Sequence, residues 1–241
     1  MRGGLVIFDC DGVLVDSEPI LNRAHAAVMT ACGCPIDEAE LLERFCGVAD
    51  SEMIRAIERE RGKPLPSDYP QRVAARIARD YRTALQPIAG IGELLDGLDA
   101  PVCVASSATP SQLRLALEIT GLLHRFGSRL YSAAMVCRGK PAPDLFLYAA
   151  KQMGAEPEAT IVVEDSLAGV AAAIAARMTA IGFCGGSHSR PGHGARLIAR
   201  GAAAAAESAP ALAAALGRLG DADRAKDRRD GCAARCLPAK S

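Results

Sequence analysis

The chain has 241 residues, half of them hydrophobic, and its 28 basic and 28 acidic side chains leave a formal net charge of zero. This balance excludes the basic surface typical of nucleic-acid-binding proteins, and the hydrophobic content excludes disorder throughout the chain. No apolar run reaches the roughly 18 residues that cross a membrane, and the N-terminal residues lack the features of a signal peptide. We therefore expect a cytoplasmic protein with no nucleic-acid or membrane partner, present as a monomer or a weak homodimer.

The first predicted strand covers residues 5–9, and the block that follows, residues 16–86, is almost entirely helical in pattern. Helical patterns begin at Glu18, after Asp37, at Ser51 and at residue 69, with breaks at 32–35 and 62–66. Asp37 is positioned to cap the second of these helices. No strand is predicted in this block.

From Pro87 onward, predicted strands and helices alternate along the chain. The strands cover 101–107, 130–132, 161–163 and 179–183, and the helices cover 93–98, 112–120, 144–153, 167–176 and 209–219. Such alternation predicts an α/β fold with a doubly wound parallel sheet. We expect residues 1–15 and 87–219 to form this Rossmann-like core and residues 16–86 to form an inserted all-helical cap. The charge-rich residues 220–241 are predicted to be disordered.

Nine cysteines are scattered along the chain, which favours reduced thiols over a disulfide framework. Two pairs, Cys32 with Cys34 and Cys232 with Cys236, resemble half of a metal site. No second pair of cysteine or histidine ligands lies at zinc-finger spacing, so we expect no zinc site.

Polar side chains gather at the ends of three predicted strands and in one loop. They are Asp9 and Asp11, Ser106 and Ser107, Glu164 and Asp165, and the loop residue Lys140. Because the carboxyl ends of parallel strands meet at one edge of a sheet, we expect these side chains to converge. Carboxylate oxygens suit Mg²⁺, while hydroxyl and ammonium groups suit the oxygens of a phosphate group.

Each of these features also has an ordinary structural explanation when it is taken alone. Asp11 followed by Gly12 is a common turn, Ser106 and Glu164 are placed to cap helices, and a lone lysine is usually solvated. Four such features at successive strand ends favour a shared site over four independent coincidences.

Four segments resemble the four motifs of the haloacid dehalogenase superfamily of aspartyl phosphatases and phosphomutases. In chain order they are 9–18 (DCDGVLVDSE), 104–107 (VASS), 139–144 (GKPAPD) and 163–166 (VEDS). The resemblance extends over roughly residues 4–200 and is closest to the subgroup with a helical cap directly after the first motif. Within that subgroup the chain is most similar to the β-phosphoglucomutase-like branch, which includes sugar-phosphate phosphatases such as 6-phosphogluconate phosphatase.

The resemblance implies a catalytic role for two aspartates. Asp9 would attack phosphorus to give an aspartyl-phosphate, and Asp11 would protonate the leaving oxygen and later deprotonate the attacking water. Ser106, Ser107 and Lys140 would bind and neutralise the phosphoryl oxygens, with Lys140 counted among the catalytic residues.

The resemblance also implies a Mg²⁺ cofactor. The ion would be held by Asp9, by the backbone carbonyl of Asp11 and by Asp165, with Glu164 binding it directly or supporting its ligands. The implied enzyme is a Mg²⁺-dependent phosphatase acting on a small phosphorylated metabolite, a sugar or sugar-acid phosphate such as 6-phosphogluconate.

Three alternatives remain open at this point. A β-phosphoglucomutase carries a phosphate-binding arginine after a Gly-Val pair in its cap, where this chain has Asp50, although Arg44 or Arg55 could replace that arginine. A dehalogenase would not need Asp11 or Asp165. A non-catalytic binding protein would be expected to have lost some of these acids.

Other residues receive structural interpretations. His188 and His193 are expected to be ordinary loop residues, and His25 and His124 to be structural or surface residues within helices. Ser17 is interpreted either as a helix cap or as a substrate contact.

Arg177 stands where the family usually has a glycine that ends a helix. We therefore expect this arginine either to adopt a left-handed backbone conformation, at a cost of about 1 kcal/mol, or to end the helix differently.

Overall fold

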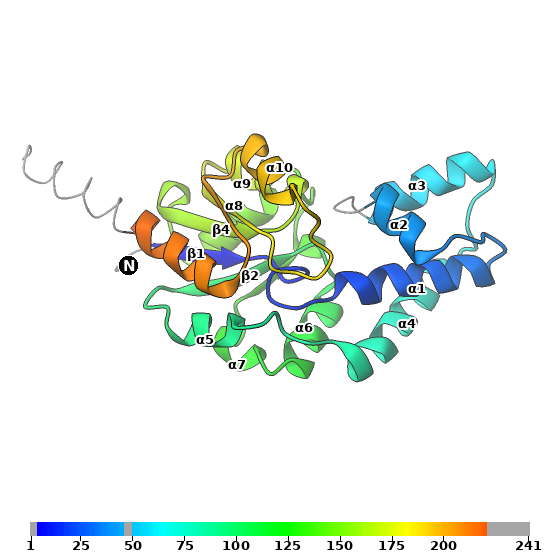
Figure 1. The fold of residues 1–241 in the computed structure, drawn as a ribbon, viewed down its shortest axis with the longest axis horizontal. Helices are drawn as coiled ribbons and strands as arrows, with labels where there is room; N and C mark the ends of the chain where they lie inside the picture. Colours follow the sequence, from blue (N-terminus) through cyan, green and yellow to red (C-terminus); the bar gives the residue numbers. More distant parts are fainter. Residues whose placement is uncertain (1–3, 46–49, 221–241) are drawn as a thin grey trace, which may run out of the picture.

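The computed structural model describes residues 4–45 and 50–220, and its centre is a six-stranded parallel sheet (Figure 1). The strands lie in the order β3-β2-β1-β4-β5-β6. Their bounds are Leu5–Phe8 (β1), Val102–Ser106 (β2), Leu130–Ser132 (β3), Thr160–Glu164 (β4), Thr179–Phe183 (β5) and Ala204–Ala206 (β6). The chain winds from β1 to one edge, returns to the other side of β1 and winds outward again, which confirms the doubly wound α/β fold.

Helices cover both faces of the sheet (Figure 1). One face packs against α5 (Ile91–Asp96), α6 (Pro110–Ile119), α7 (Leu123–Phe126) and a last helix over residues 209–220. The other packs against α8 (Asp144–Gln152), α9 (Leu167–Ala175) and α10 (His193–Arg200). Because both faces are covered, β1, β2 and β4 are buried along their whole length, which explains their continuous apolar sequences.

Four helices lie between β1 and α5 and extend away from the sheet (Figure 1). They are α1 (Glu18–Ala31), α2 (Glu38–Phe45), α3 (Asp50–Arg61) and α4 (Tyr69–Ala84). α1 packs against α4, and Asp37 caps α2 by accepting a 2.7 Å hydrogen bond from the backbone N–H of Glu40, as expected. The division into core and cap at residues 15/16 and 86/87 remains a prediction.

β6 and α10 are among the elements that were not expected from the sequence. β6 consists of three alanines, which have little intrinsic preference for a strand, and it forms because its backbone pairs with β5. α10 begins inside a stretch rich in glycine, at a residue that follows the left-handed Gly192. Pattern alone detects neither element.

α6 begins at Pro110, two residues before the predicted start, because Thr109 and Gln112 form a reciprocal capping box. No helix in the part of the chain that the structure describes is long and apolar enough to span a membrane. Residues 46–49 and 221–241 lie outside the described residues, and the second of these ranges includes Cys232, Cys236 and nearly all of the predicted disordered tail.

Candidate active site

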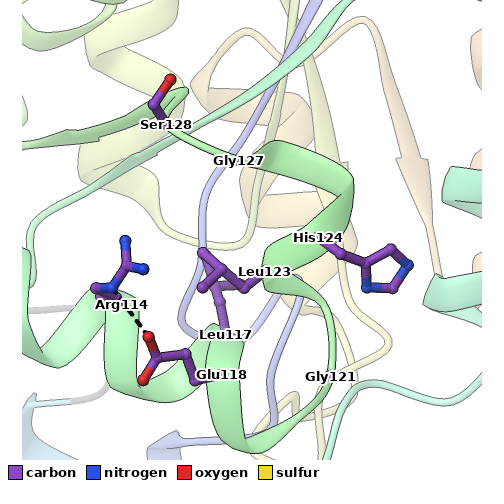
Figure 2. Close-up of a pocket in the computed structure, with 8 residues that line it drawn as sticks. All are labelled: Arg114, Leu117, Glu118, Gly121, Leu123, His124, Gly127 and Ser128. Carbon is purple, nitrogen blue, oxygen red and sulfur yellow. Dashed lines mark ion pairs between the residues drawn. The ribbon is translucent and has the colours of Figure 1, made fainter.

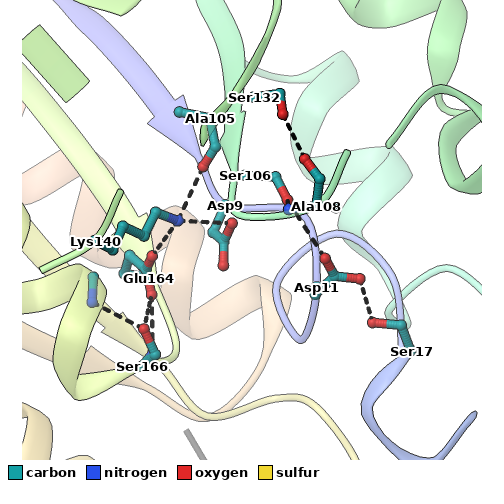
Figure 3. A network of polar contacts seen from close by, with 11 residues as sticks. Asp9, Asp11, Ser17, Ala105, Ser106, Ala108, Ser132, Lys140, Glu164 and Ser166 are labelled. Carbon is teal, nitrogen blue, oxygen red and sulfur yellow. Dashed lines mark hydrogen bonds and ion pairs between the residues drawn. The ribbon is translucent and has the colours of Figure 1, made fainter. Parts of the chain in front are cut away.

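The strand register brings the predicted site residues to one edge of the sheet. Phe8 in β1 pairs with Val104 in β2 and with Val163 in β4, so the residues that follow these three lie at the same level. Asp9 therefore lies between Ser106 and Glu164, at the point where the strand order reverses, which is where ligands bind in such sheets (Figure 3).

Lys140 lies between two carboxylates (Figure 3). Its Nζ atom is 2.9 Å from Oδ1 of Asp9 and 2.6 Å from Oε1 of Glu164, and it donates a 3.0 Å hydrogen bond to the carbonyl oxygen of Ala105. Burial alone would lower the pKa of Lys140, but the attraction of Asp9 and Glu164 outweighs it and raises the pKa above its usual value. Lys140 is therefore a fixed positive charge and not the ordinary surface lysine considered as an alternative.

Three buried carboxylates converge beside this lysine. Asp9, Glu164 and Asp165 each offer an oxygen atom, and these atoms lie within 4.8 Å of one another. Burial raises the pKa of Asp9 and of Asp165, and the neighbouring charge of Glu164 raises both further. Among the described residues this is the one group of acids, histidines and cysteines spaced to hold a metal ion. An all-oxygen, negatively charged donor set fits Mg²⁺.

Two glycines make this close approach of acids possible. A Cβ atom at Gly12, whose φ is +73°, would lie 2.0 Å from Oδ2 of Asp165. A Cβ atom at Gly169 would lie 1.8 Å from the carboxyl group of Glu164. Both contacts are shorter than real Cβ atoms allow, so any side chain at either position displaces an acid of the site.

The Asp11 carboxyl group points away from this acid cluster and is held by three hydroxyl groups. Its Oδ1 atom accepts hydrogen bonds from Ser17 (2.6 Å) and from Tyr81 (3.4 Å), and Oδ2 lies 3.4 Å from Oγ of Ser106. Burial raises the pKa of Asp11, while the hydrogen bond from Ser17 lowers it. The two aspartates of the first motif thus occupy different environments.

Ser17 does not cap α1 with its side chain, whereas its role as a substrate contact stays a prediction. It precedes α1, but its hydroxyl makes no capping hydrogen bond and is directed instead to Asp11. Ser106 is buried and accepts a hydrogen bond from the backbone N–H of Ala108. Ser107 is exposed, and no hydrogen bond joins its hydroxyl to another described residue. Of the seven predicted site residues, Ser107 is the one whose side chain lies outside these hydrogen bonds, ion pairs and clustered acids.

Two histidines were wrongly expected to be ordinary loop residues. Nε2 of His188, a buried side chain, lies 3.0 Å from Oδ2 of Asp165, and Nε2 of His193 lies 2.6 Å from the backbone oxygen of the same residue. The connection between β5 and α10 folds back over the sheet edge, where Ser187 also donates two hydrogen bonds to Asp16. The position of this connection after a parallel strand was the available signal.

A second group of polar side chains in contact lies among the helices α1, α3 and α4. Nδ1 of His25 lies 2.7 Å from the hydroxyl of Tyr69, and Nε2 lies 3.4 Å from a carboxylate oxygen of Asp50. His25 is therefore structural, as expected. Arg44 forms ion pairs with Glu40 and Glu60 at the surface of the helical segment, so its guanidinium group is already paired with two carboxylates.

A separate hollow on the surface lies beside α6 and α7 (Figure 2). Its polar side chains include Arg114 and Glu118, which form an ion pair with each other, and His124. None of the strand-end acids lines this hollow, so it is separate from the candidate active site at the sheet edge.

The first strand of this parallel sheet ends in a nucleophile candidate, and a buried lysine and the further acids of the neighbouring strand β4 lie beside it. This combination defines a class of hydrolases. A family model described as haloacid dehalogenase-like hydrolase matches residues 4–177, which is more than half of the chain. The chain therefore belongs to the haloacid dehalogenase-like hydrolases, and the family resemblance inferred from its motifs is confirmed.

Three similar proteins illustrate this membership. 6-phosphogluconate phosphatase of Escherichia coli K12 is 37% identical over 77% of this chain and 85% of its own length. Beta-phosphoglucomutase of Bacillus subtilis 168 is 30% identical over 81% of this chain and 88% of its own. A solved haloacid dehalogenase-like protein of unknown function from Agrobacterium tumefaciens C58 is 35% identical, covers 90% of this chain and 99% of its own, and superimposes with a TM-score of 0.80.

Proposed function

We propose that this protein is a Mg²⁺-dependent phosphatase that hydrolyses the phosphate ester of a small carbohydrate through an aspartyl-phosphate. The observation that carries the proposal is the position of the Lys140 ammonium group between Asp9 and Glu164, beside Asp165. A buried cation next to a carboxylate is an arrangement suited to phosphoryl transfer, which depends on positioning and charge neutralisation. The phosphatase among the similar proteins supports the same reaction.

In the first half of the reaction, a carboxylate oxygen of Asp9 attacks phosphorus while the bond from phosphorus to the sugar oxygen breaks. Lys140 neutralises the charge on the phosphoryl oxygens, and Ser106, at the end of the neighbouring strand β2, is the hydroxyl group that we assign to binding them. The Asp11 carboxyl group gives its proton to the departing oxygen, so that the product leaves as a neutral alcohol.

In the second half, water attacks phosphorus and the Asp9 oxygen leaves as a carboxylate. Asp11, now ionised, takes the proton from this water, which restores both aspartates to their starting forms. The contacts of the two aspartates support this division of roles, since Asp9 pairs with the Lys140 ammonium group, which favours its ionised form, whereas Asp11 contacts hydroxyl groups.

The acid cluster fits a Mg²⁺ ion. Asp9, Asp165 and Glu164 offer oxygen ligands of the kind that Mg²⁺ prefers, and the backbone carbonyl of Asp11 is the fourth group we assign to it. Bound there, the ion would neutralise the charge of a phosphate group beside these acids. Glu164 also accepts hydrogen bonds from the backbone and side chain of Ser166, which fix its orientation.

A phosphomutase is the second candidate, because one of the similar proteins is a beta-phosphoglucomutase. A mutase must bind a second phosphate in its cap. In this chain Asp50 occupies the start of α3, near the place where mutases carry an arginine, and its charge would repel that phosphate. The Gly47-Val48 pair used for this comparison lies outside the described residues.

The experiment that tests the proposal is a phosphate-release screen over sugar, sugar-acid, polyol, nucleotide and glycolate phosphates, with Mg²⁺ and with EDTA. Mg²⁺-dependent release from at least one carbohydrate phosphate is expected. Conversion of β-glucose 1-phosphate to glucose 6-phosphate in the presence of a bisphosphate activator, without net phosphate release, would support the mutase instead.

We further propose a cytoplasmic protein that is a monomer or a weak homodimer. The free cysteines of the described part of the chain support a reducing compartment. Cell fractionation and sedimentation over a range of concentrations test both statements.

A further inference from the structure

One contact of the candidate active site comes from outside the sheet. Tyr81 lies near the end of α4, seventy residues from Asp11 in sequence, and its hydroxyl reaches Oδ1 of Asp11 at 3.4 Å. The same oxygen accepts the 2.6 Å hydrogen bond from Ser17 (Figure 3). Two donors therefore converge on one oxygen of this carboxyl group, and both belong to the chain segments that lead into and out of the helical block.

The hydroxyl of Tyr81 is buried, so it needs a hydrogen-bond partner inside the protein. The side chain is 3% exposed, and a buried hydroxyl group without a partner costs about 1–3 kcal/mol. Burial, and then the charge of Asp11, raise the pKa of Tyr81, so the phenol keeps its proton and remains a donor. It donates to Asp11, and the Ser17 hydroxyl also contacts it.

The arrangement distinguishes the two oxygens of Asp11. Oδ1 accepts from Ser17 and Tyr81, so a proton on that oxygen would compete with two donors. Oδ2 accepts from one hydroxyl group, that of Ser106 at 3.4 Å, which lies at the end of β2 on the side proposed for the phosphate. A proton held by Asp11 is therefore directed to Oδ2, from which it can reach the oxygen that leaves phosphorus.

We propose that Tyr81 is a positioning residue that, together with Ser17, holds the Asp11 carboxyl group so that its proton sits on Oδ2 and faces the leaving oxygen. This inference rests on the proposed phosphatase function. In the step that it concerns, the proton moves from Oδ2 to the ester oxygen as the phosphorus–oxygen bond breaks. The alcohol departs neutral, and Asp11 is left as a carboxylate that accepts both hydrogen bonds more strongly.

The proposal predicts a dependence on the leaving group. A sugar phosphate must release an alkoxide unless a proton is supplied, whereas 4-nitrophenyl phosphate releases a phenolate that is stable without one. Removing the Tyr81 hydroxyl should therefore slow the first substrate and leave the second nearly unaffected.

The experiment measures kcat and KM of Tyr81→Phe on both substrates with saturating Mg²⁺. We expect kcat on the sugar phosphate found in the screen to fall about 10- to 100-fold, with KM unchanged. This is less than the roughly 100- to 10,000-fold that general acid catalysis contributes, because the acid is mispositioned and not removed. On 4-nitrophenyl phosphate we expect a change of less than about threefold. The matched control is Tyr69→Phe, because Tyr69 is a buried tyrosine on the same helix whose hydroxyl lies against His25 and not against Asp11.

Both substrates are assayed on one preparation, so the ratio of their kcat values is independent of the fraction of enzyme that is folded. Ser17→Ala provides a second variant, with a loss selective for the sugar phosphate also expected. An equal loss on both substrates, or no loss on either, would overturn the positioning role while leaving the phosphatase assignment intact. Failure of the unmodified enzyme to release phosphate from any ester would overturn the phosphatase assignment, and this inference with it.

Discussion

Nζ of Lys140 lies 2.6 Å from Oε1 of Glu164, a side chain that is wholly buried at the end of β4. A charge in such a place is stable only with a partner of opposite sign, and Lys140 serves both Glu164 and Asp9. Under the proposed mechanism the pair therefore has two roles, since it stabilises the sheet edge and would supply the cation for the phosphate group.

Replacing this lysine tests both roles together. Lys140→Met retains most of the volume but leaves Glu164 and Asp9 without their cation, so we expect activity to be lost and the free energy of unfolding to fall by about 3–5 kcal/mol in metal-free buffer. Urea unfolding measures the second effect. Lys151→Met, at an exposed position of α8, is the control and should change neither quantity.

A double variant separates charge from packing in the same experiment. Glu164→Gln, combined with Lys140→Met, removes the uncompensated negative charge, so part of the lost stability should return. A double variant no more stable than Lys140→Met alone would mean that the buried charge is not the cause.

His188 is predicted to affect metal binding, because its Nε2 atom lies 3.0 Å from Oδ2 of Asp165, one of the three acids spaced to hold a metal ion. His188→Gln should weaken Mg²⁺ binding about 10- to 100-fold, the usual effect of losing a group that supports a metal ligand. Isothermal titration with Mg²⁺ measures the affinity directly, and the Mg²⁺-induced rise in melting temperature gives a second readout. His124→Gln, on α7 far from the acids in sequence, should bind Mg²⁺ like the unmodified protein.

Glu18 is predicted to make stability depend on pH. Burial, and then the charge of Asp165, raise its pKa to about 8, well above the value of about 4.3 in an unfolded chain. The folded protein therefore binds more protons, and this contribution to stability is fully present below about pH 4 and is lost as the pH rises through about 8.

Comparing Glu18→Gln with the unmodified protein isolates this effect. The variant cannot ionise, so its stability relative to the unmodified protein should increase between pH 5 and pH 9 in the presence of EDTA. Chemical unfolding across that range provides the measurement, and two parallel stability curves would contradict the prediction.

Arg177 ends α9 with φ of +60°, the conformation that glycine adopts without strain. The N–H groups of Arg177 and Met178 bond to the carbonyls of Ile174 and Ala173, so the helix ends in a Schellman motif despite the arginine. Arg177→Gly should raise the free energy of unfolding by about 1 kcal/mol without changing kcat. Arg177→Ala retains the strained Cβ atom and should give no such gain. A melting temperature of Arg177→Gly that is unchanged or lower would disprove the idea.

The parts of the fold that the sequence predicted well are those determined by burial. β1, β2 and β4 are apolar because helices cover both faces of the sheet, and their polar ends mark where burial stops. Asp9, Ser106 and Glu164 could therefore be placed at one edge without knowing any contact.

The parts that escaped prediction depend on contacts distant in sequence. β6 is a strand because it pairs with β5, and His188 belongs to the site because its loop returns over Asp165. Tyr81 approaches Asp11 through the packing of α4 against α1, which no local pattern encodes. Ser107 resembled its neighbour in type, but the alternation of side chains along the chain directs it to solvent.

The central claim is that a carboxylate oxygen of Asp9 takes the phosphoryl group. The most direct test is the rate of phosphate release by Asp9→Asn from the best substrate of the screen, with Mg²⁺ titration of the same preparation to verify that the site still binds the ion. We predict a loss of at least about 1,000-fold in kcat, because the amide cannot form the intermediate. Turnover within about tenfold of the unmodified enzyme would contradict the account.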